Sequence, residues 1–413
     1  MAEGGDAFLR SPPISFFGVP TAATPPHAFN LPKAMNNAKN TTLFPYLERL
    51  LEGEAVEWKT LGDKEYISIE NNARKAVNSM SRIPGKTPYY GANNIQDYVE
   101  GYTHDGVYIL IAEDGTASVE QYSIQWAEGK FWANNHVHVI KGTEKINNRF
   151  LYYFLKTVNY TPFLKGGGRA KLTKAKLQEI PFAVPPLRVQ ARIVEILDKF
   201  TQLEAELEAE LEARKKQYAY YRDQLLNFSQ CPPLNVNIEW KTLGEVCDIV
   251  KAASKLKSGD YCVSGKVPII DQGAQYIAGY TDKELATIPK DEYIIFGDHT
   301  ETIKFVDFEF VQGADGLKIL HTKKALSKYV YYAFSNFYKK TASYKRHWSK
   351  AKETSIPLPP LSEQRRIVDI LDRFDTLTNS ISEGLPKEIA LRRKQYEYYR
   401  DALLNFPRAE VTA

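Results

Sequence analysis

Two basic segments are the most chemically distinctive feature of this 413-residue chain. Residues 165–176 hold five cations and no acid, and residues 339–352 hold six cations and no acid. An isolated lysine run is usually a solvated face, but two such segments mixed with Gly, Ser, Thr and aromatic residues favour contact with nucleic-acid phosphates. Phosphate contacts set the register on a duplex without reading its sequence. The cations expected to make them are Lys165, Arg169, Lys171, Lys174, Lys176, Lys345, Arg346, Lys350 and Lys352.

Two polar loops carry amide side chains that could read base edges. Asn93 and Asn94 lie in the loop at residues 91–96, and Gln272 and Gln275 lie in the loop at residues 271–275. Asn and Gln can each form two hydrogen bonds with adenine in the major groove. Loops this polar are more often simple turns, so both interpretations stay open.

Motifs of common enzyme sites are missing from the sequence. It contains no GxxxxGK[ST] phosphate loop, no strand-flanked GxGxxG, and no Pro-Pro pair preceded by the Asn or Asp of an adenine methyltransferase. The Glu-Trp-Lys at residues 57–59 and 239–241 superficially resembles a nuclease Glu-x-Lys but lacks a convincing upstream Asp. His136 and His138 have no third ligand spaced nearby, and polar strand positions explain them better. We therefore expect no catalytic, metal or cofactor site in this chain.

Composition and charge point to a folded cytoplasmic protein. Apolar residues make up 43% and charged residues 25%, and the net charge of +4 is mild. No apolar run is long enough to cross a bilayer, and the first residues do not form a secretory signal. Cys231, Cys247 and Cys262 match neither a zinc pattern nor a disulfide framework, which fits a reducing compartment. We expect no membrane partner.

The chain repeats itself at offsets of 174–182 residues. The repeated motifs are EWKTLG at 57–62 and 239–244, PPL at 185–187 and 359–361, and KQYxYYRD at 216–223 and 394–401. A period this long indicates a duplicated domain rather than a solenoid unit. The protein should therefore have pseudo-twofold symmetry.

Each repeat begins with a globule and ends with a helix. The globular part alternates short β-branched and aromatic runs with turn residues, which predicts a mixed α/β unit of roughly 120 residues. Residues 187–228 then contain no Pro or Gly and place apolar residues at steps of three and four. The second helix has the same seam but contains Gly384 and Pro386, which should kink or break it.

One apolar stripe on a long helix needs a partner, and the other copy is the nearest one. Antiparallel pairing would hold the globules roughly 60 Å apart at the ends of a rod. The alternative is that each helix packs back on its own globule. The predicted domains are an irregular or disordered extension (1–42), a first globule (43–184), a first helix (185–229), a second globule (230–358), a second helix (359–407) and a tail (408–413).

Two α/β globules, each followed by a PPL…QxRIV helix that ends in KQYxYYRDxLLNF, resemble the specificity subunit of a type I restriction-modification system. The resemblance covers residues 43–406, and the helical motifs are its most specific part. It implies an α+β fold with two target-recognition domains separated by two long antiparallel helices. Each domain would bind one half of a bipartite site in double-stranded DNA. The Leu-Glu-Ala-Glu array at residues 203–210 resembles the short repeats that set the spacer in some members.

The resemblance also implies partners and cofactors. The helices would dock two DNA-methyltransferase subunits, and restriction-translocation subunits would join the full complex. S-adenosylmethionine, Mg²⁺ and ATP would be used by those subunits and not by this chain. The N-terminal extension and the Gly384/Pro386 break depart from the family pattern.

The residues alone predict only a two-headed DNA-binding scaffold. A stand-alone architectural DNA-binding protein is therefore the alternative function. An enzyme with duplicated active sites is a third class, and the missing motifs argue against it.

Overall fold

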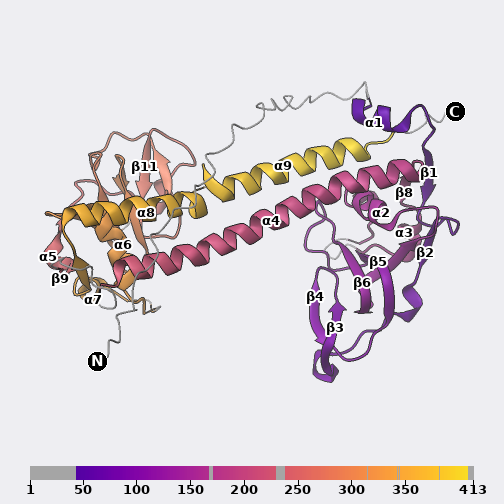
Figure 1. Ribbon diagram of the computed structural model, residues 1–413, viewed down its shortest axis with the longest axis horizontal. Coiled ribbons are helices and arrows are strands. Elements are labelled where there is room, and N and C mark those ends of the chain that lie inside the picture. Colours follow the sequence, from indigo (N-terminus) through magenta and orange to yellow (C-terminus); the bar gives the residue numbers. More distant parts are fainter. Residues whose placement is uncertain are drawn as a thin grey trace, which may run out of the picture.

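The computed structural model describes residues 43–166, 171–228, 238–313, 315–341, 343, 345–380 and 382–407. In these ranges two mixed α/β globules sit at opposite ends of a helical rod, so the predicted fold class is confirmed. The first globule lies on one side of the rod, and most of the second lies on the other side at the opposite end (Figure 1). No helix in the described part of the chain is long and apolar enough to cross a membrane.

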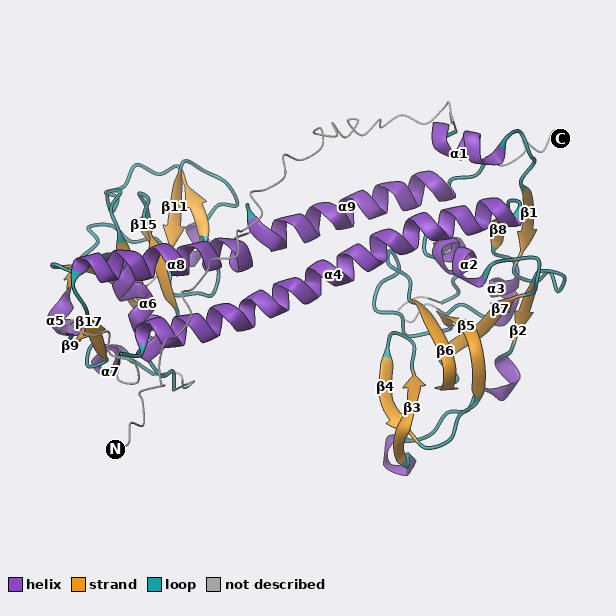
Figure 2. Ribbon diagram, viewed as in Figure 1, coloured by secondary structure: helices purple, strands orange, loops and turns teal. Residues whose placement is uncertain are grey.

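The helices of the rod are α4 (Leu187–Leu226), α8 (Leu361–Asn379) and α9 (Gly384–Leu404). α4 runs from the first globule to the second, and α8 and α9 return along it, so the predicted antiparallel pairing is confirmed (Figure 2). Aromatic rings fix the register. Phe200 stacks on Tyr399 with ring centroids 5.4 Å apart, and the equivalent Phe374 stacks on Tyr221 at 5.6 Å. Because the two contacts join equivalent residues of the two copies, the side-chain packing follows the pseudo-twofold symmetry.

The second helix is interrupted where the sequence predicts it. α8 ends at Asn379 and α9 begins at Gly384, whose φ of +72° is costly for any residue with a Cβ. A Cβ at Gly384 would also lie 2.4 Å from the carbonyl oxygen of Thr376. Pro386 falls in the first turn of α9, where its missing N–H has no helical partner to lose.

The first globule is built on a six-stranded sheet of order β2-β7-β5-β6-β3-β4. Its strands are β2 (Ile67–Ile69), β3 (Pro84–Tyr90), β4 (Ile95–Val99), β5 (His104–Ala112), β6 (Ile124–Ala133) and β7 (Val137–Gly142). β5 is buried on both faces. Ile109 and Ile111 face the core that contains α2 (Asn148–Leu155), whereas Tyr108 and Leu110 face a smaller cluster around Phe131.

The second globule has the same strand order divided between two sheets, β10-β16-β13-β14 and β12-β11-β15. Its strands are β10 (Cys247–Val250), β11 (Val267–Ile270), β12 (Gly279–Thr281), β13 (Tyr293–Gly297), β14 (Ile303–Val306), β15 (Val311–Gln312) and β16 (Leu317–Thr322). β14 and β15 together take the place of β6. The parallel pairing of Tyr89 with Trp132 in the first globule corresponds to that of Ile269 with Val311 in the second.

A two-stranded ribbon joins the start of each globule to its end. β1 (Glu57–Thr60) pairs with β8 (Pro181–Val184), and β9 (Glu239–Thr242) pairs with β17 (Ser355–Leu358). The remaining helices are α1 (Pro45–Leu51), α3 (Lys174–Gln178), α5 (Leu243–Val246), α6 (Ser327–Phe337) and α7 (Trp348–Ala351), with single-turn helices at Asn71–Ala73, Ser79–Ser81, Thr161–Phe163 and Ser258–Asp260.

A buried glutamine attaches each globule to the rod. Gln190 accepts a hydrogen bond from the backbone N–H of Asn147 at 2.8 Å and donates to Pro185 O at 2.8 Å. Gln364 accepts from the N–H of Leu326 at 3.0 Å and donates to Pro359 O at 2.8 Å. The Gln of the repeated QxRIV motif thus satisfies backbone groups at the junction of helix and globule in both copies.

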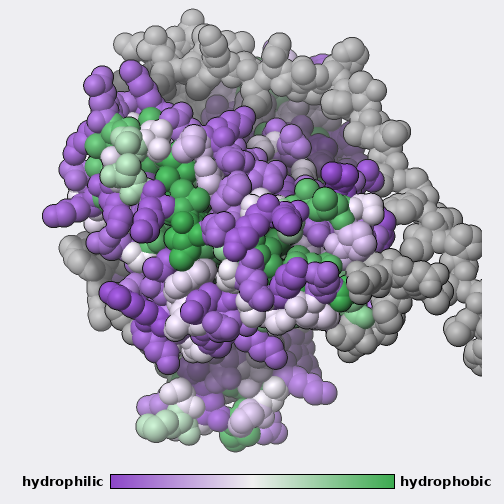
Figure 3. All heavy atoms as spheres, turned by 90° about the vertical axis from the view of Figure 1, so that its left-hand side faces the viewer, coloured by the Kyte–Doolittle hydropathy of each residue, from purple (hydrophilic) through white to green (hydrophobic). Residues whose placement is uncertain are grey.

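Each globule completes its core with the far end of the other copy's helix. Leu403, Leu404 and Phe406 are buried with the residues of the first globule, and Leu226 and Phe228 are buried with those of the second. The predicted domain boundaries follow the sequence and therefore do not include this exchange of core residues between the two copies. At the end of the molecule that carries β9 and α5, hydrophilic residues cover most of the surface and apolar residues form small groups (Figure 3).

Candidate nucleic-acid interface

The first basic segment is attached to the end of the central strand β5. Glu113 follows the last residue of β5, and its carbonyl oxygen accepts a hydrogen bond of 2.7 Å from the N–H of Leu172. The ammonium of Lys171 lies 3.0 Å from Glu113 Oε1 and 3.9 Å from Asp114 Oδ2. The described part of the segment therefore runs across the strand end.

Cations control the charge of the Glu113 carboxyl. Burial alone would raise the pKa of Glu113, but hydrogen bonds from Arg74 and Lys171 outweigh burial and hold this pKa below its usual range. His138 lies beneath this cluster with no exposed surface. Its Nε2 donates to Leu172 O at 2.7 Å, and its Nδ1 accepts from the amide of Asn71 at 2.9 Å. Burial lowers the pKa of His138, so the neutral ring that fits both bonds is favoured.

The second basic segment is attached to the end of β13 in the same manner. Asp298 follows β13, and its backbone oxygen accepts a hydrogen bond of 2.9 Å from the N–H of His347. Its carboxylate also accepts from the N–H groups of His347 and Trp348, both at 2.8 Å. Buried Glu301 accepts from Tyr338 Oη at 2.7 Å and from the N–H of Thr341 at 2.9 Å.

The polar loops lie at these same strand ends. Asn93 donates to Gly115 O at 2.8 Å and accepts from the N–H of Ala117 at 2.9 Å, next to the Asp114–Lys171 bridge. Gln272 donates to Asp315 O at 3.3 Å and accepts from the N–H of His299, the residue after Asp298. We call each set of polar loop and basic segment the loop end of its globule. The structure thus brings together residues that the sequence places about 70 positions apart.

The predicted phosphate-binding cations differ in how strongly the chain already engages them. Lys171 is paired with Glu113, Lys176 lies 2.5 Å from Glu179, and Lys352 lies 3.6 Å from Glu353. Lys350 donates to Lys339 O at 2.9 Å. Among these predicted cations, Lys165, Lys174, Lys345 and Arg346 are exposed and have neither an ion pair nor a side-chain hydrogen bond within the described residues. Arg169 lies outside the described residues.

The four candidate base-reading amides also divide into two pairs. Asn93 and Gln272 use both ends of the amide to hold loops. Asn94 and Gln275 are exposed, and within the described ranges their side chains have no hydrogen-bond partner. Sequence reasoning missed Glu113, Asp298 and His347 as the residues that hold the loop ends. The available signal was an acid immediately after a run of strand residues, as at Ile111 to Glu113.

The residues weighed for enzyme chemistry have structural partners. Glu57 pairs with Lys59 at 3.0 Å, and Glu239 pairs with Lys241 at 2.6 Å, all on exposed ribbons. Among the described residues, no group of three His, Cys, Asp or Glu side chains is placed to hold a metal ion.

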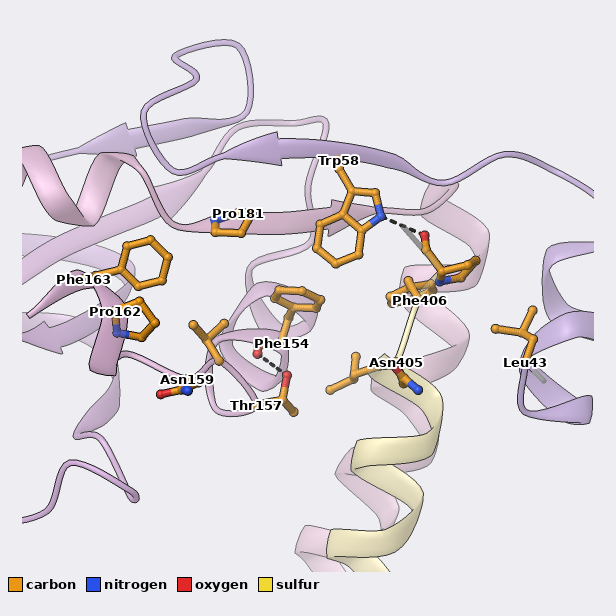
Figure 4. A pocket seen from close by; sticks show the side chains of 13 residues that line it. Leu43, Trp58, Phe154, Thr157, Asn159, Pro162, Phe163, Pro181, Asn405 and Phe406 are labelled. Atoms are coloured by element: carbon orange, nitrogen blue, oxygen red, sulfur yellow. Dashed lines mark hydrogen bonds between the residues drawn. The ribbon is translucent and has the colours of Figure 1, made fainter. Parts of the chain in front are cut away.

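A pocket of about 660 Å³ lies where the end of α9 meets the first globule (Figure 4). Trp58, Phe154, Phe163 and Phe406 line it, and Trp58 Nε1 donates to Pro407 O at 2.9 Å. Its lining includes Thr and Asn but no acid, base or thiol. The pocket therefore offers shape and apolar surface, without groups for acid–base or nucleophilic chemistry.

Two similar loop ends on a pseudo-symmetric rod define a two-headed scaffold. The chain matches the type I restriction modification DNA specificity domain at residues 55–213 and again at 235–391, and it belongs to that family. It is 48% identical over 389 residues to a putative type I restriction enzyme specificity subunit of Haemophilus influenzae, covering 87% of this chain and 98% of the relative.

It is 33% identical over 413 residues to the EcoR124I/EcoR124II specificity subunit of Escherichia coli, covering 89% of this chain and 98% of the relative. The fold is similar to that of the type I restriction-modification S subunit from M. genitalium. That likeness has a TM-score of 0.57 at 16% identity and covers 86% of this chain and 97% of the other.

Proposed function

We propose that this chain is the DNA-reading subunit of a type I restriction-modification complex, and that each loop end binds one half of a bipartite target in double-stranded DNA. One observation carries the proposal: the pseudo-twofold axis relates two sites in which exposed amides and unpaired cations occupy the same end of equivalent sheets. Exposed cations such as Lys174 and Arg346 would contact phosphates, and the amides of Asn94 and Gln275 would contact bases.

Domain exchange tests this division of labour. Replacing residues 58–184 with the corresponding domain of a relative should change one half-site of the methylated sequence and leave the other half-site and the spacer unchanged. Methylation-site mapping of the complex measures both halves at once. A change in both halves would show that the globules read DNA jointly and would contradict the proposal.

We propose that the rod docks two DNA-methyltransferase subunits, with restriction-translocation subunits completing the complex. Tyr220 and Tyr398 occupy equivalent positions on the two helices and are 62% and 40% exposed. Leu391, on the same rod, is 52% exposed. The two tyrosine side chains left in water at symmetric positions favour a pair of identical partners. Co-purification of two methyltransferase copies per chain tests this stoichiometry, and its loss in Tyr220→Ala/Tyr398→Ala is the expected result.

The same test separates this function from a stand-alone architectural DNA-binding protein, which would bind DNA without a methyltransferase. We further propose that this cytoplasmic chain is non-catalytic and that S-adenosylmethionine, Mg²⁺ and ATP serve the partner subunits. The purified chain should show no methylation, cleavage or ATP hydrolysis. Turnover that co-purifies with the single chain and is abolished by a substitution within it would contradict this assignment.

The rod would also set the distance between half-sites. Deleting Leu207 to Glu210 should shorten α4 by about 6 Å, or one to two base-pair steps, while the apolar seam returns nearly in phase. Deleting two residues should rotate the seam by about 200° and disrupt the helix pairing. Methylation-site mapping should report a shorter spacer for the first deletion, and an unchanged spacer would mean that the rod does not measure the site.

A further inference from the structure

Gln125 anchors the polar loop of the first globule through hydrogen bonds to the loop backbone. It is the second residue of β6 and is half-buried. Its Nε2 donates to two backbone oxygens of the loop, Gly91 O at 2.9 Å and Ala92 O at 3.2 Å. One side chain thus fixes two successive peptide units next to Asn93 and Asn94.

Lys304 does the same in the second globule with a different functional group. It is the second residue of β14, the counterpart of β6, and its side chain is 4% exposed. Its ammonium donates to Asp271 O at 2.8 Å and to Gln275 O at 2.6 Å. The Asp271 carboxylate lies 3.9 Å away and supplies the opposite charge.

We propose that Gln125 and Lys304 are equivalent positioning residues that set the base preference of their half-sites by holding the polar loops. This inference rests on the proposed function, because it presumes that these loops meet DNA. It goes further by naming two residues that touch no DNA and still determine which bases are accepted.

The physical argument is that base reading requires amides held in a defined position. An amide discriminates between bases only when both of its hydrogen bonds form together, and a loop that shifts loses that geometry. Gln275 carries the backbone oxygen that Lys304 holds, so the anchored oxygen and the exposed amide belong to one residue. In the first globule Asn94 is two residues from the anchored Ala92. Without the anchor, these backbone oxygens would be left without the donors that satisfy them.

The nature of Lys304 supports a specific role rather than simple filling of space. Burying an ammonium is costly unless several acceptors surround it, whereas an apolar residue of similar length would fill the same volume without that cost. Burial lowers the pKa of Lys304, and Asp271 only partly offsets that effect. In the first globule the neutral amide of Gln125 makes the same two-point contact. The requirement that the two globules share is therefore hydrogen-bond donation to the loop.

The test uses the full chain in the complex with which it co-purifies, and a library of duplexes randomised over both half-sites. Lys304→Met should reduce base discrimination in one half-site by roughly 5- to 150-fold and leave the other half-site unchanged. Gln125→Met should produce the reverse pattern. The salt dependence of binding to non-specific DNA should stay at the wild-type value, because no phosphate-binding cation is altered.

Further variants separate positioning from folding. Lys304→Arg keeps a cation with several donors and should recover part of the lost discrimination. If Lys304→Met does not fold, as judged by thermal unfolding, Gln125→Met still decides the question at its half-buried site. If the wild-type chain shows no base preference at either half-site, the proposed function itself is contradicted. If the wild-type chain shows such a preference and both Met variants retain it unchanged, only the positioning role is overturned.

Discussion

The two globules place a polar loop and a basic segment at equivalent strand ends, although their sheets are built differently. In the first, β6 runs unbroken from Ile124 to Ala133 and holds all six strands in one sheet. In the second, β14 and β15 share that role and the sheet divides in two. Both nevertheless present a polar loop and a basic segment at the end of the central strand. The topology of the backbone, rather than the continuity of the sheet, is therefore what places the loop ends.

The fastening of the basic segments follows the same rule. The first segment is held by a charged cluster around Glu113, and the second by hydrogen bonds to Asp298 and Glu301. In each case the residue after the central strand accepts a backbone N–H from the segment. Different side chains can therefore change what a domain reads without changing where it is held.

The largest expected effect comes from the exchanged core residues. Phe406→Ala should destabilise the first globule by about 3–5 kcal/mol, because Phe406 is 4% exposed and its ring lies 6.1 Å from that of Phe150. Phe228→Ala should destabilise the second globule instead. Hydrogen exchange resolved by peptide would assign each loss to its domain, and the exposed Tyr220→Ala serves as the control. Equal losses in both globules after either change would mean that the two cores are not separate.

The next effect distinguishes free from paired cations. Lys165→Ala/Lys174→Ala and Lys345→Ala/Arg346→Ala should each weaken binding to every DNA sequence and reduce the salt-dependence slope by about two. Lys171→Ala is the matched control, since Glu113 already balances its charge and the slope should change less. Affinity measured over a salt series checks this. If Lys171→Ala altered the slope as much as a free cation does, its ion pair would have to break on binding.

A pH effect should appear in the first globule. His138 has a pKa below its ordinary value of 6.5, so the unfolded chain binds the proton first and stability should decrease as pH falls below about 6.5. The charged groups that interact electrostatically with the His138 ring are Glu113, Arg74 and Lys171. One proton can change the unfolding free energy by at most about 1.4 kcal/mol per pH unit.

Glu113, whose pKa lies below its ordinary value of 4.5, should add a second loss below that pH. Urea unfolding from pH 8 down to about pH 2, with His138→Gln as the comparison, measures both steps. The variant should lose the upper step and keep the lower one. An upper step that survives in His138→Gln would belong to another group.

The smallest effect is expected for the two Glu–Lys pairs of the ribbons, whose removal should leave the activity of the complex unchanged. Glu57→Gln and Glu239→Gln remove the exposed pairs with Lys59 and Lys241, and neither change should alter methylation or cleavage by the assembled complex. Activity assays with both variants check this. Loss of cleavage in either one would revive the nuclease interpretation for that ribbon.

The internal repeat, the strand-like runs and the apolar seam were sufficient to predict the globules, the rod and its antiparallel pairing. Gly384 and Pro386, which occur in the second copy, predicted the break, because helix-breaking residues act locally. The loop ends could be predicted only as separate pieces, because hydrogen bonds between distant segments bring Asn93, Asp114 and Lys171 together. Gln125 gave no signal, since a polar residue in an alternating strand is typical of a solvent-facing position. Its role depends on a tertiary contact that no local pattern encodes.

The burial of Leu403, Leu404 and Phe406 in the first globule sets an order of events on the ribosome. The first globule is synthesised through Val184, but its core is complete only after the final helix, roughly 220 residues later. At translation rates of about 5–20 residues per second, that interval is on the order of 10–45 s. During this time the second globule can finish folding, because its own borrowed residues, Leu226 and Phe228, precede it. The domain made first is therefore the one completed last.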